Sequence, residues 1–267
     1  SPDEIQTKAA AVSMPTDFPT GEMPKNPRWF SPPLYGMPEF HNVFSNRQLT
    51  ALTTFSGLIN TVREQIVSDG GSPEYANAIS VYLAFIIDQM ANHSSTLCLW
   101  NEPNEQMAMT FSRQALPMVW NYAECNMFSN STGSFDNLIK RQVKGLSTLG
   151  VGKPGNAKQS DAQSRSLESK VMVSTDPPYY DNIGYADLSD FFYIWMRQSL
   201  KDIYPDLFRT MLVPKAEELV ATPYRFSRGM EEAKAFFESG MLQTFRQINE
   251  YVVDDVPLSV YYAFKQS

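Results

Sequence analysis

The residues best suited to chemistry lie together in Asp176-Pro177-Pro178-Tyr179, directly after the apolar run KVMVST. We predict that this run is a buried strand of an open parallel sheet, where ligands bind at the carboxyl ends of the strands. The prolines lack a backbone N–H and stiffen the turn, so the carbonyl oxygens beside them have no neighbouring amide donor. The Asp176 carboxylate and such a carbonyl suit an amino group that carries two hydrogens. Tyr179 adds a flat ring for stacking, which predicts a site for the exocyclic amine of a flipped-out aromatic base.

A longer sequence around this motif, DPPYYDNIGYADLSDFFYIW, carries a resemblance to a known family. Asp-Pro-Pro-Tyr resembles the catalytic motif of the amino-methyltransferases that act on adenine N6 in DNA. The longer sequence resembles one group of them, the large adenine-specific DNA methylases that contain a domain of unknown function and a zinc ribbon. RQLTALTTF, STLCLWN, FSRQALPMVW and YYAFKQ also resemble that group, so the resemblance covers most of residues 44–267.

The resemblance implies methylation of DNA by S-adenosyl-L-methionine, with the target base flipped into the pocket at the motif. Asp176 and the carbonyl of Pro177 would accept hydrogen bonds from the amine and raise the electron density on its nitrogen. Pro178 would stiffen the turn, and Tyr179 would stack on the base. Four further residues would line the pocket mouth, or would serve only as loop and helix-cap residues: Tyr180, Asp181, Asn182 and Tyr185. The family also suggests partner proteins of a restriction or anti-phage system.

The cofactor site has less support in the sequence. Asp161 resembles the acidic residue that lies near the adenine of the cofactor in these methylases, although a solvated aspartate in a turn is the alternative. GVGKPG, residues 150–155, has the spacing of a dinucleotide fingerprint, but no amphipathic helix follows it, which predicts a flexible loop. The resemblance implies a glycine-rich cofactor motif upstream of this sequence. We therefore expect a piece of a longer protein that, alone, is inactive or binds the cofactor weakly.

The charge distribution bears on nucleic-acid binding. A net charge of −7 argues against a surface that binds nucleic acid through bulk charge. The middle of the chain is locally basic, and its cations could contact phosphates beside the flipped base or could simply be solvated. The candidate phosphate contacts are Lys140, Arg141, Lys144, Lys153 and Lys158.

The cysteines and the hydropathy pattern narrow the class of protein. Cys98 and Cys125 are too few for a disulfide framework and lack metal-ligand spacing, so no metal site is predicted. Cys98 lies in STLCLW, which we predict to be a buried strand. No apolar run approaches the roughly 18 residues of a membrane span, and the first residues do not resemble a signal peptide. We expect a cytoplasmic protein with reduced thiols and no membrane contact.

Patterns in the first half of the chain predict an extended arm followed by helices. Residues 1–44 are rich in proline and should form an extended arm over the surface. Residues 45–144 should be a helical region that begins with two antiparallel helices. A capping box at Ser45 and Gln48 starts the first helix, and Ser72 followed by a proline starts the second.

The second half of the chain should contain the catalytic motif. Residues 145–169 are predicted to be a flexible basic loop, and residues 170–267 to be the motif-bearing part of a methyltransferase domain. Four elements follow in order: the strand KVMVST, a helix capped by Asp187, a helix near residues 230–252 and the strand PLSVYYAFKQ. This order implies a crossover connection and a parallel sheet. The predicted fold is α/β: part of a Rossmann-like S-adenosylmethionine-dependent methyltransferase fold, with a helical hairpin and an extended N-terminal arm.

Other functions remain open on the sequence alone. Methylation of RNA or of cytosine N4 would use a similar acceptor site, because these substrates also present an amine on an aromatic ring. A different class is a non-catalytic DNA-binding or scaffold domain that kept the motif after losing its cofactor site. The plainest alternative is a proline turn that only ends a strand.

Overall fold

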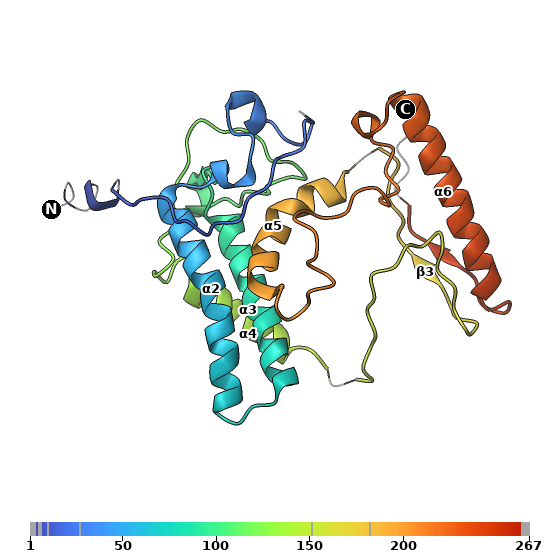
Figure 1. The fold of residues 1–267 in the computed structure, drawn as a ribbon, viewed down its shortest axis with the longest axis horizontal. Helices are drawn as coiled ribbons and strands as arrows, with labels where there is room; N and C mark the ends of the chain where they lie inside the picture. Colours follow the sequence, from blue (N-terminus) through green and yellow to red (C-terminus); the bar gives the residue numbers. More distant parts are fainter. Residues whose placement is uncertain are drawn as a thin grey trace. The chain divides into compact units, whose positions relative to one another are not determined.

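The structure is a computed structural model that describes residues 4, 7–9, 11–26, 28–150, 152–181 and 183–262. The chain divides into two compact units (Figure 1). Unit 1 comprises Ser1–Gly150 and Asp187–Val213, and unit 2 comprises Val151–Ala186 and Pro214–Ser267. Helix α5 (Tyr185–Leu200) begins in unit 2 and continues into unit 1. The described part of the chain mixes helices with two small sheets, one of them parallel.

The helical hairpin predicted from the capping residues is confirmed. Helices α2 (Asn46–Ser68) and α3 (Pro73–His93) pack side by side in unit 1 (Figure 1). The backbone N–H of Ser45 donates to Gln48 Oε1 at 2.8 Å, and that of Gln48 donates to Ser45 Oγ at 3.3 Å. At the start of α3, Ser72 Oγ accepts from the backbone N–H of Tyr75 at 3.2 Å. These bonds satisfy amide donors that have no partner within the helix, which sets where each helix begins.

Apart from most of α5, the other described elements of unit 1 are short, except for helix α4. These are η1 (Pro32–Tyr35), η2 (Phe40–Val43), the antiparallel strands β1 (Trp100–Asn101) and β2 (Gln106–Met107), η3 (Glu102–Asn104) and α4 (Phe135–Ser147). The N-terminal section is therefore less extended than predicted, because its prolines occupy the first positions of η1, where no N–H is needed. It also contributes to the core, since Phe30 and Phe40 are fully buried.

An aromatic cluster forms the centre of unit 1. Phe44 stacks on Phe191 with ring centroids 5.5 Å apart, and Trp195 meets Phe44 edge-on at the same distance. Phe111 contacts Phe191 edge-on at 5.2 Å. Phe191 and Trp195 lie one turn apart on α5, so this helix supplies one side of the cluster.

Cys98 lies between a turn and strand β1 and not within the predicted strand. Residues 94–97 form a bend and a turn, and the strand begins only at Trp100. Ser95 Oγ accepts a bond from the backbone N–H of Leu97 at 3.1 Å and contacts Thr110 Oγ1 at 2.7 Å. Such local side-chain bonds compete with strand pairing. Cys98 is nevertheless buried, in a cluster with Met107 and Cys125.

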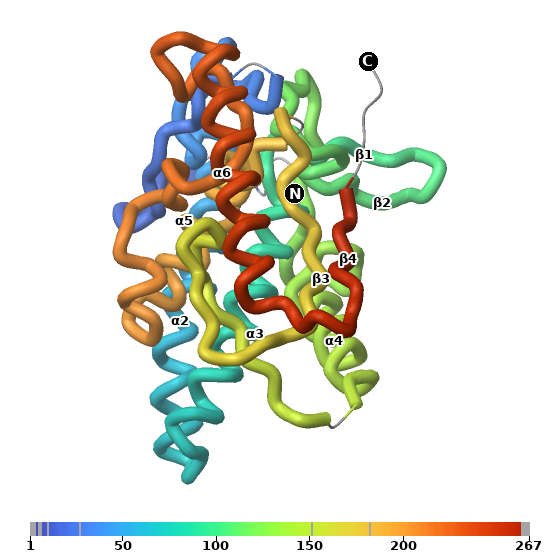
Figure 2. Tube along the Cα trace, turned by 90° about the vertical axis from the view of Figure 1, so that its right-hand side faces the viewer, coloured from blue at the N-terminus to red at the C-terminus, as the bar shows by residue number. Residues whose placement is uncertain are grey.

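Unit 2 contains a parallel strand pair, as the order of elements predicts. β3 (Ser174–Thr175) pairs in parallel with β4 (Ser259–Val260), and a parallel bridge joins Val171 to Val252 (Figure 2). Between the strands the chain forms α5, most of which belongs to unit 1, then η4 (Pro223–Arg225) and the long helix α6 (Met230–Tyr251). Among the described residues, β3 and β4 each have two residues and are shorter than KVMVST and PLSVYYAFKQ suggest; the last residues of the second run lie outside the described residues.

A buried carboxylate in α3 leads to a prediction about stability. Asp88 is 8% exposed, and its Oδ1 has no hydrogen-bond partner among the described residues. Burial raises the pKa of Asp88 well above its ordinary value of 3.8. The folded state thus binds this proton more tightly than the unfolded state. The stability that the proton gives is complete below about pH 4 and is lost as the pH rises through the folded pKa.

Asp88→Asn is therefore expected to raise the free energy of unfolding at pH 8 by about 1 kcal/mol or more, because it replaces a buried charge with a neutral amide, which costs less to bury. Near pH 4 the variant and the natural protein should be equally stable. Urea unfolding at both pH values measures this difference, with Asp206→Asn, at an exposed position, as the control. A pH-independent difference would contradict the assignment of the effect to ionisation.

Among the described residues, no helix combines the length and the apolar character that a membrane crossing requires.

Candidate functional site

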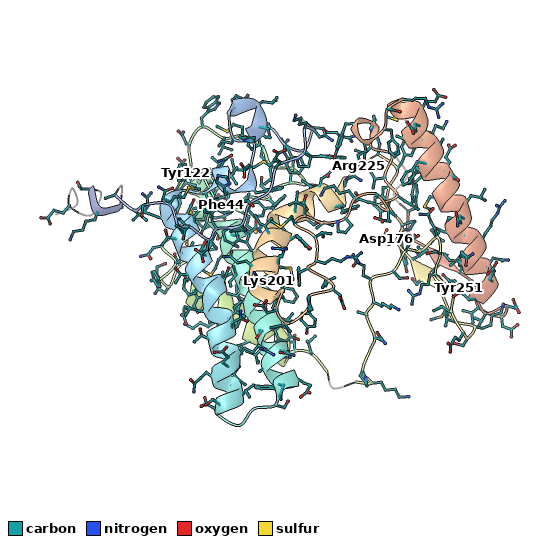
Figure 3. All side chains as sticks on the ribbon, viewed as in Figure 1. Phe44, Tyr122, Asp176, Lys201, Arg225 and Tyr251 are labelled. Carbon is teal, nitrogen blue, oxygen red and sulfur yellow. The ribbon has the colours of Figure 1, made fainter. Side chains whose placement is uncertain are left out.

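Asp176 lies at the carboxyl end of β3, as predicted from the sequence. The backbone N–H of Tyr261 donates to the carbonyl of Thr175 at 2.8 Å, so the end of β4 lies beside the residue that precedes Asp176. The Asp176 side chain is exposed (Figure 3). No described residue donates a hydrogen bond to the carbonyl of Pro177. An exposed carboxylate and an adjacent open carbonyl are thus present at the edge where the two parallel strands end.

Tyr179 turns back toward Asp176. Its hydroxyl donates to Asp176 Oδ1 at 2.6 Å, and this bond, with a smaller contribution from burial, raises the pKa of Tyr179 above its ordinary value of 10.0. The bond fixes the position of the ring beside the carboxylate. It leaves Oδ2 and part of the acceptor capacity of Oδ1, because an ionised carboxylate can accept about four hydrogen bonds.

The end of β4 adds an aromatic residue that the sequence reasoning missed. Tyr262 meets the Tyr179 ring edge-on, with centroids 5.5 Å apart and an angle of 81° between the planes. Both rings are partly exposed. The sequence did not identify this tyrosine, because it lies in the middle of the predicted strand PLSVYYAFKQ, whereas β4 ends at Val260.

Tyr180 anchors the motif to unit 2. Its backbone has a φ of 45°, in the left-handed region, and its N–H donates to the carbonyl of Pro178 at 3.3 Å. Its carbonyl accepts from the N–H of Ala221 at 2.9 Å, and its ring packs edge-on against Phe237 of α6 at 5.2 Å. A non-glycine residue adopts such a conformation only where its surroundings hold it, and here the contacts do so on both sides.

A second anchor holds the start of α5. Glu218 Oε1 accepts from the backbone N–H of Ala186 at 2.8 Å, and its Oε2 accepts from Arg225 Nη1 at 2.9 Å. A carboxylate at a helix N-terminus satisfies a free amide and interacts favourably with the helix dipole. Residues 176–186 are therefore held by Ala221 in their middle and by Glu218 at their end. No sequence signal pointed to Glu218 or Arg225.

The remaining predicted mouth residues lie on the same segment. Asp181 is half-buried, and Tyr185, the first residue of α5, is exposed. Asn182 lies outside the described residues. Their role at a pocket mouth stays a prediction.

Asp161, the residue proposed to lie near the cofactor, is in a turn, and its contact with S-adenosyl-L-methionine stays a prediction. Asp161 is exposed and accepts bonds within its own turn, from the N–H of Gln163 at 2.9 Å and the hydroxyl of Ser164 at 3.3 Å. Residues 152–160 have no regular secondary structure. A Cβ added at Gly150, Gly152 or Gly155 would meet no atom within 4 Å, so no close packing among the described residues requires glycine at these positions.

The predicted phosphate contacts fall in both units. Lys140, Arg141 and Lys144 lie on α4 in unit 1 and are exposed; Lys140 forms an ion pair with Asp136 one turn earlier. Lys153 and Lys158 are exposed in the irregular segment of unit 2. Their contact with nucleic acid stays a prediction. Within the described ranges, no group of three or more His, Cys, Asp or Glu residues could hold a metal ion.

Comparisons with family models, with curated proteins and with solved structures find no match to this chain.

Proposed function

We propose that this chain contains the amine-binding segment of a DNA methyltransferase that acts on adenine N6. One observation carries the proposal: an exposed carboxylate and an open proline carbonyl lie together at the carboxyl end of a parallel strand. Ligands bind at this position in open parallel sheets. Both groups are acceptors only, which matches an NH₂ group and excludes a carbonyl oxygen as the group they bind.

Different residues of the segment bind the amine and stack on the base. The amine donates one hydrogen to Asp176 Oδ2 and the other to the carbonyl of Pro177. Both bonds draw the hydrogens away from the amine nitrogen and make its lone pair a better nucleophile. Tyr179, held by its bond to Asp176, and Tyr262 provide aromatic surface beside these acceptors. Stacking on aromatic side chains offsets part of the cost of taking a base out of the helix, which is a few kcal/mol.

The resemblance, and not the geometry, selects adenine, DNA and the methyl donor. S-adenosyl-L-methionine is the donor that the resemblance implies, within the Rossmann-like fold expected for this family. Asp161 would lie near the adenine of the donor, and its bonds among the described residues stay within its own turn. The part of the reaction assigned to the described residues is therefore the binding and orientation of the amine.

The test of this function is a map of modified bases. The intact gene that encodes this sequence should be expressed in cells that lack adenine methylation. Sequencing of their DNA is expected to show N6-methyladenine at a fixed sequence, absent from cells with an empty vector. N4-methylcytosine in its place would show that adenine is not the target base, and modified RNA would show that DNA is not the substrate.

A second function, a base-binding domain without methyl transfer, rests on the same acceptors, because the Asp176 carboxylate, the Pro177 carbonyl and the Tyr179 ring can bind a base without a methyl donor. It predicts no modified base in DNA or RNA of the same cells. It also predicts that the protein binds DNA with an unpaired adenine more tightly than fully paired DNA. The base map and this binding comparison together separate the two functions.

A further inference from the structure

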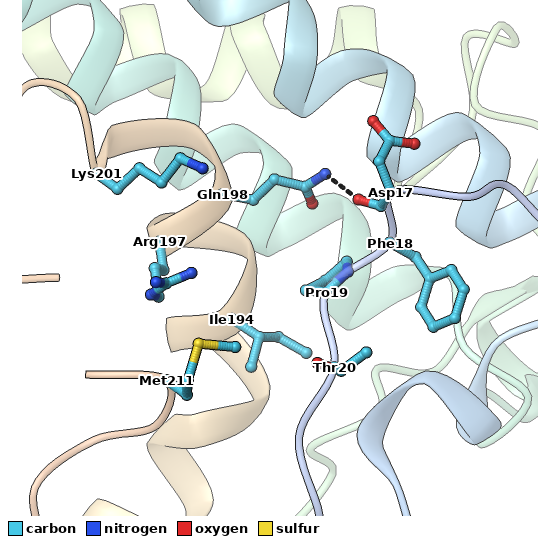
Figure 4. Close-up of a pocket in the computed structure, with 9 residues that line it drawn as sticks. All are labelled: Asp17, Phe18, Pro19, Thr20, Ile194, Arg197, Gln198, Lys201 and Met211. Atoms are coloured by element: carbon cyan, nitrogen blue, oxygen red, sulfur yellow. Dashed lines mark hydrogen bonds between the residues drawn. The ribbon is translucent and has the colours of Figure 1, made fainter. Parts of the chain in front are cut away.

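A cavity in unit 1 has two cationic side chains in its lining. It has a volume of about 170 Å³ and lies between residues 17–20 and the second half of α5 (Figure 4). Its lining residues are Asp17, Phe18, Pro19, Thr20, Ile194, Arg197, Gln198, Lys201 and Met211. All of them belong to unit 1.

Arg197 and Lys201 lie one turn apart on the same side of α5 and its C-terminal end. Like charges at this spacing repel each other by a few tenths of a kcal/mol, and a carboxylate between them would remove the repulsion. The chain has 29 acidic residues and a net charge of −7, so carboxylates are plentiful. Yet neither Arg197 nor Lys201 forms an ion pair with any described residue.

The walls of the cavity are fixed by hydrogen bonds that leave the cationic groups available. Arg197 Nε donates to the carbonyl of Phe208 at 3.1 Å, which orients the guanidinium while both Nη groups remain for another acceptor. Gln198 Nε2 donates to the backbone carbonyl of Asp17 at 2.8 Å and ties residues 17–20 to α5. The Asp17 carboxylate points away from Arg197 in Figure 4, so it does not neutralise the site.

We propose that this cavity binds a phosphate group. A volume of about 170 Å³ is below the roughly 300–1,000 Å³ of pockets that enclose a whole small molecule, so it suits one oxyanion group. The planar fork of Arg197 can hold two oxygens, Lys201 a third, and the hydroxyl of Thr20 can donate to another. A phosphate monoester has three terminal oxygens and one ester oxygen, and a phosphodiester has two of each, whereas a carboxylate has two oxygens in all. The phosphate can come from a free phosphate monoester or from a nucleic-acid backbone.

The position beside the C-terminus of α5 affects the expected affinity. The negative end of a helix dipole disfavours an anion, so binding depends on both cations acting together. The loss of either one should therefore weaken binding strongly. This site lies in the unit that does not contain Asp176, and its proposal does not depend on methyl transfer.

Titration of the full chain with inorganic phosphate tests the proposal. At constant ionic strength, phosphate is expected to raise the melting temperature of the natural protein in a saturable manner, because a ligand of the folded state stabilises it. Lys201→Ala should weaken the apparent affinity about tenfold, as expected for the loss of one charged hydrogen bond. Lys201 is exposed and its side chain makes no hydrogen bond to a described residue, so its variant should melt at the same temperature as the natural protein without phosphate.

Lys234→Ala is the matched control, because Lys234 is also an exposed helix lysine but has a carboxylate partner, Glu238. It should bind phosphate like the natural protein. An unsaturable response of the natural protein, or an equal loss in both lysine variants, would overturn the site.

Two further ligands identify the source of the phosphate. Tighter binding of a nucleoside monophosphate than of a dinucleoside phosphodiester, with the difference lost in Lys201→Ala, indicates a phosphate monoester. The reverse order indicates a nucleic-acid backbone. Because these measurements require no methylation, they stand whatever the map of modified bases shows.

Discussion

Asp176→Ala is expected to reduce adenine methylation in cells by about a hundredfold or more, the range seen when one stabilising hydrogen-bond partner is removed from an active site. The carboxylate is exposed and bonds only to the hydroxyl of Tyr179 among the described residues. Its removal therefore costs the fold little, while the amine loses its only charged acceptor. The measurement is the fraction of modified adenines at the recognised sequence, in cells that express equal amounts of each protein.

Asp255→Ala is the control for this prediction, since Asp255 is another exposed aspartate of unit 2 outside the motif. It should leave methylation unchanged. Asp176→Asn refines the result: it keeps the shape and one oxygen acceptor but removes the charge, so intermediate activity is expected. If Asp176→Ala methylated as much DNA as the natural protein, the carboxylate would have no part in binding the amine.

Trp195→Ala is expected to lower the free energy of unfolding by about 3–5 kcal/mol, the usual cost of removing a large aromatic side chain from a core. Trp195 is fully buried and packs edge-on against Phe44 in the aromatic cluster of unit 1. Alanine would lose this contact and leave a large cavity. Guanidinium unfolding followed by circular dichroism measures the change without depending on tryptophan fluorescence.

Trp120→Ala provides the matched comparison. Trp120 also meets an aromatic ring edge-on, that of Tyr35 at 5.4 Å, but it is 80% exposed. Its loss should change the free energy of unfolding by no more than about 0.5–1 kcal/mol. Similar losses for both tryptophans would show that Trp195 is not central to the core of unit 1.

Both predictions involve features that were only partly visible in the sequence. The motif Asp176-Pro177-Pro178-Tyr179 and its place after a strand could be identified because the signals are short-range. Proline stiffens adjacent residues, and a strand pattern ends where the apolar residues end. The hydrogen bond between Tyr179 and Asp176 was not foreseen, because it depends on the conformation of the turn.

The predictions failed for the strand in STLCLW and for the fully extended arm, because local bonds or distant packing outweighed the sequence pattern. STLCLW has the composition of a strand, but the side chain of Ser95 bonds to the backbone of Leu97 and turns the chain. The N-terminal section, rich in proline, forms 3₁₀ turns and contributes Phe30 and Phe40 to the core. Burial of these rings outweighs the tendency of a proline-rich segment to stay extended.

By itself, the sequence determined the helix starts at Ser45 and Ser72, the order of strands and helices in unit 2, and an acceptor motif at a strand end. Each depends on residues a few positions apart. Only the tertiary structure decided which distant residues complete the site. Tyr262 reaches Tyr179 because parallel pairing brings two strand ends together, and Glu218 reaches Ala186 across 32 positions of the chain. Arg197 and Lys201 line a cavity only because residues 17–20 fold against α5. Such contacts arise from packing between distant segments, which no local pattern encodes.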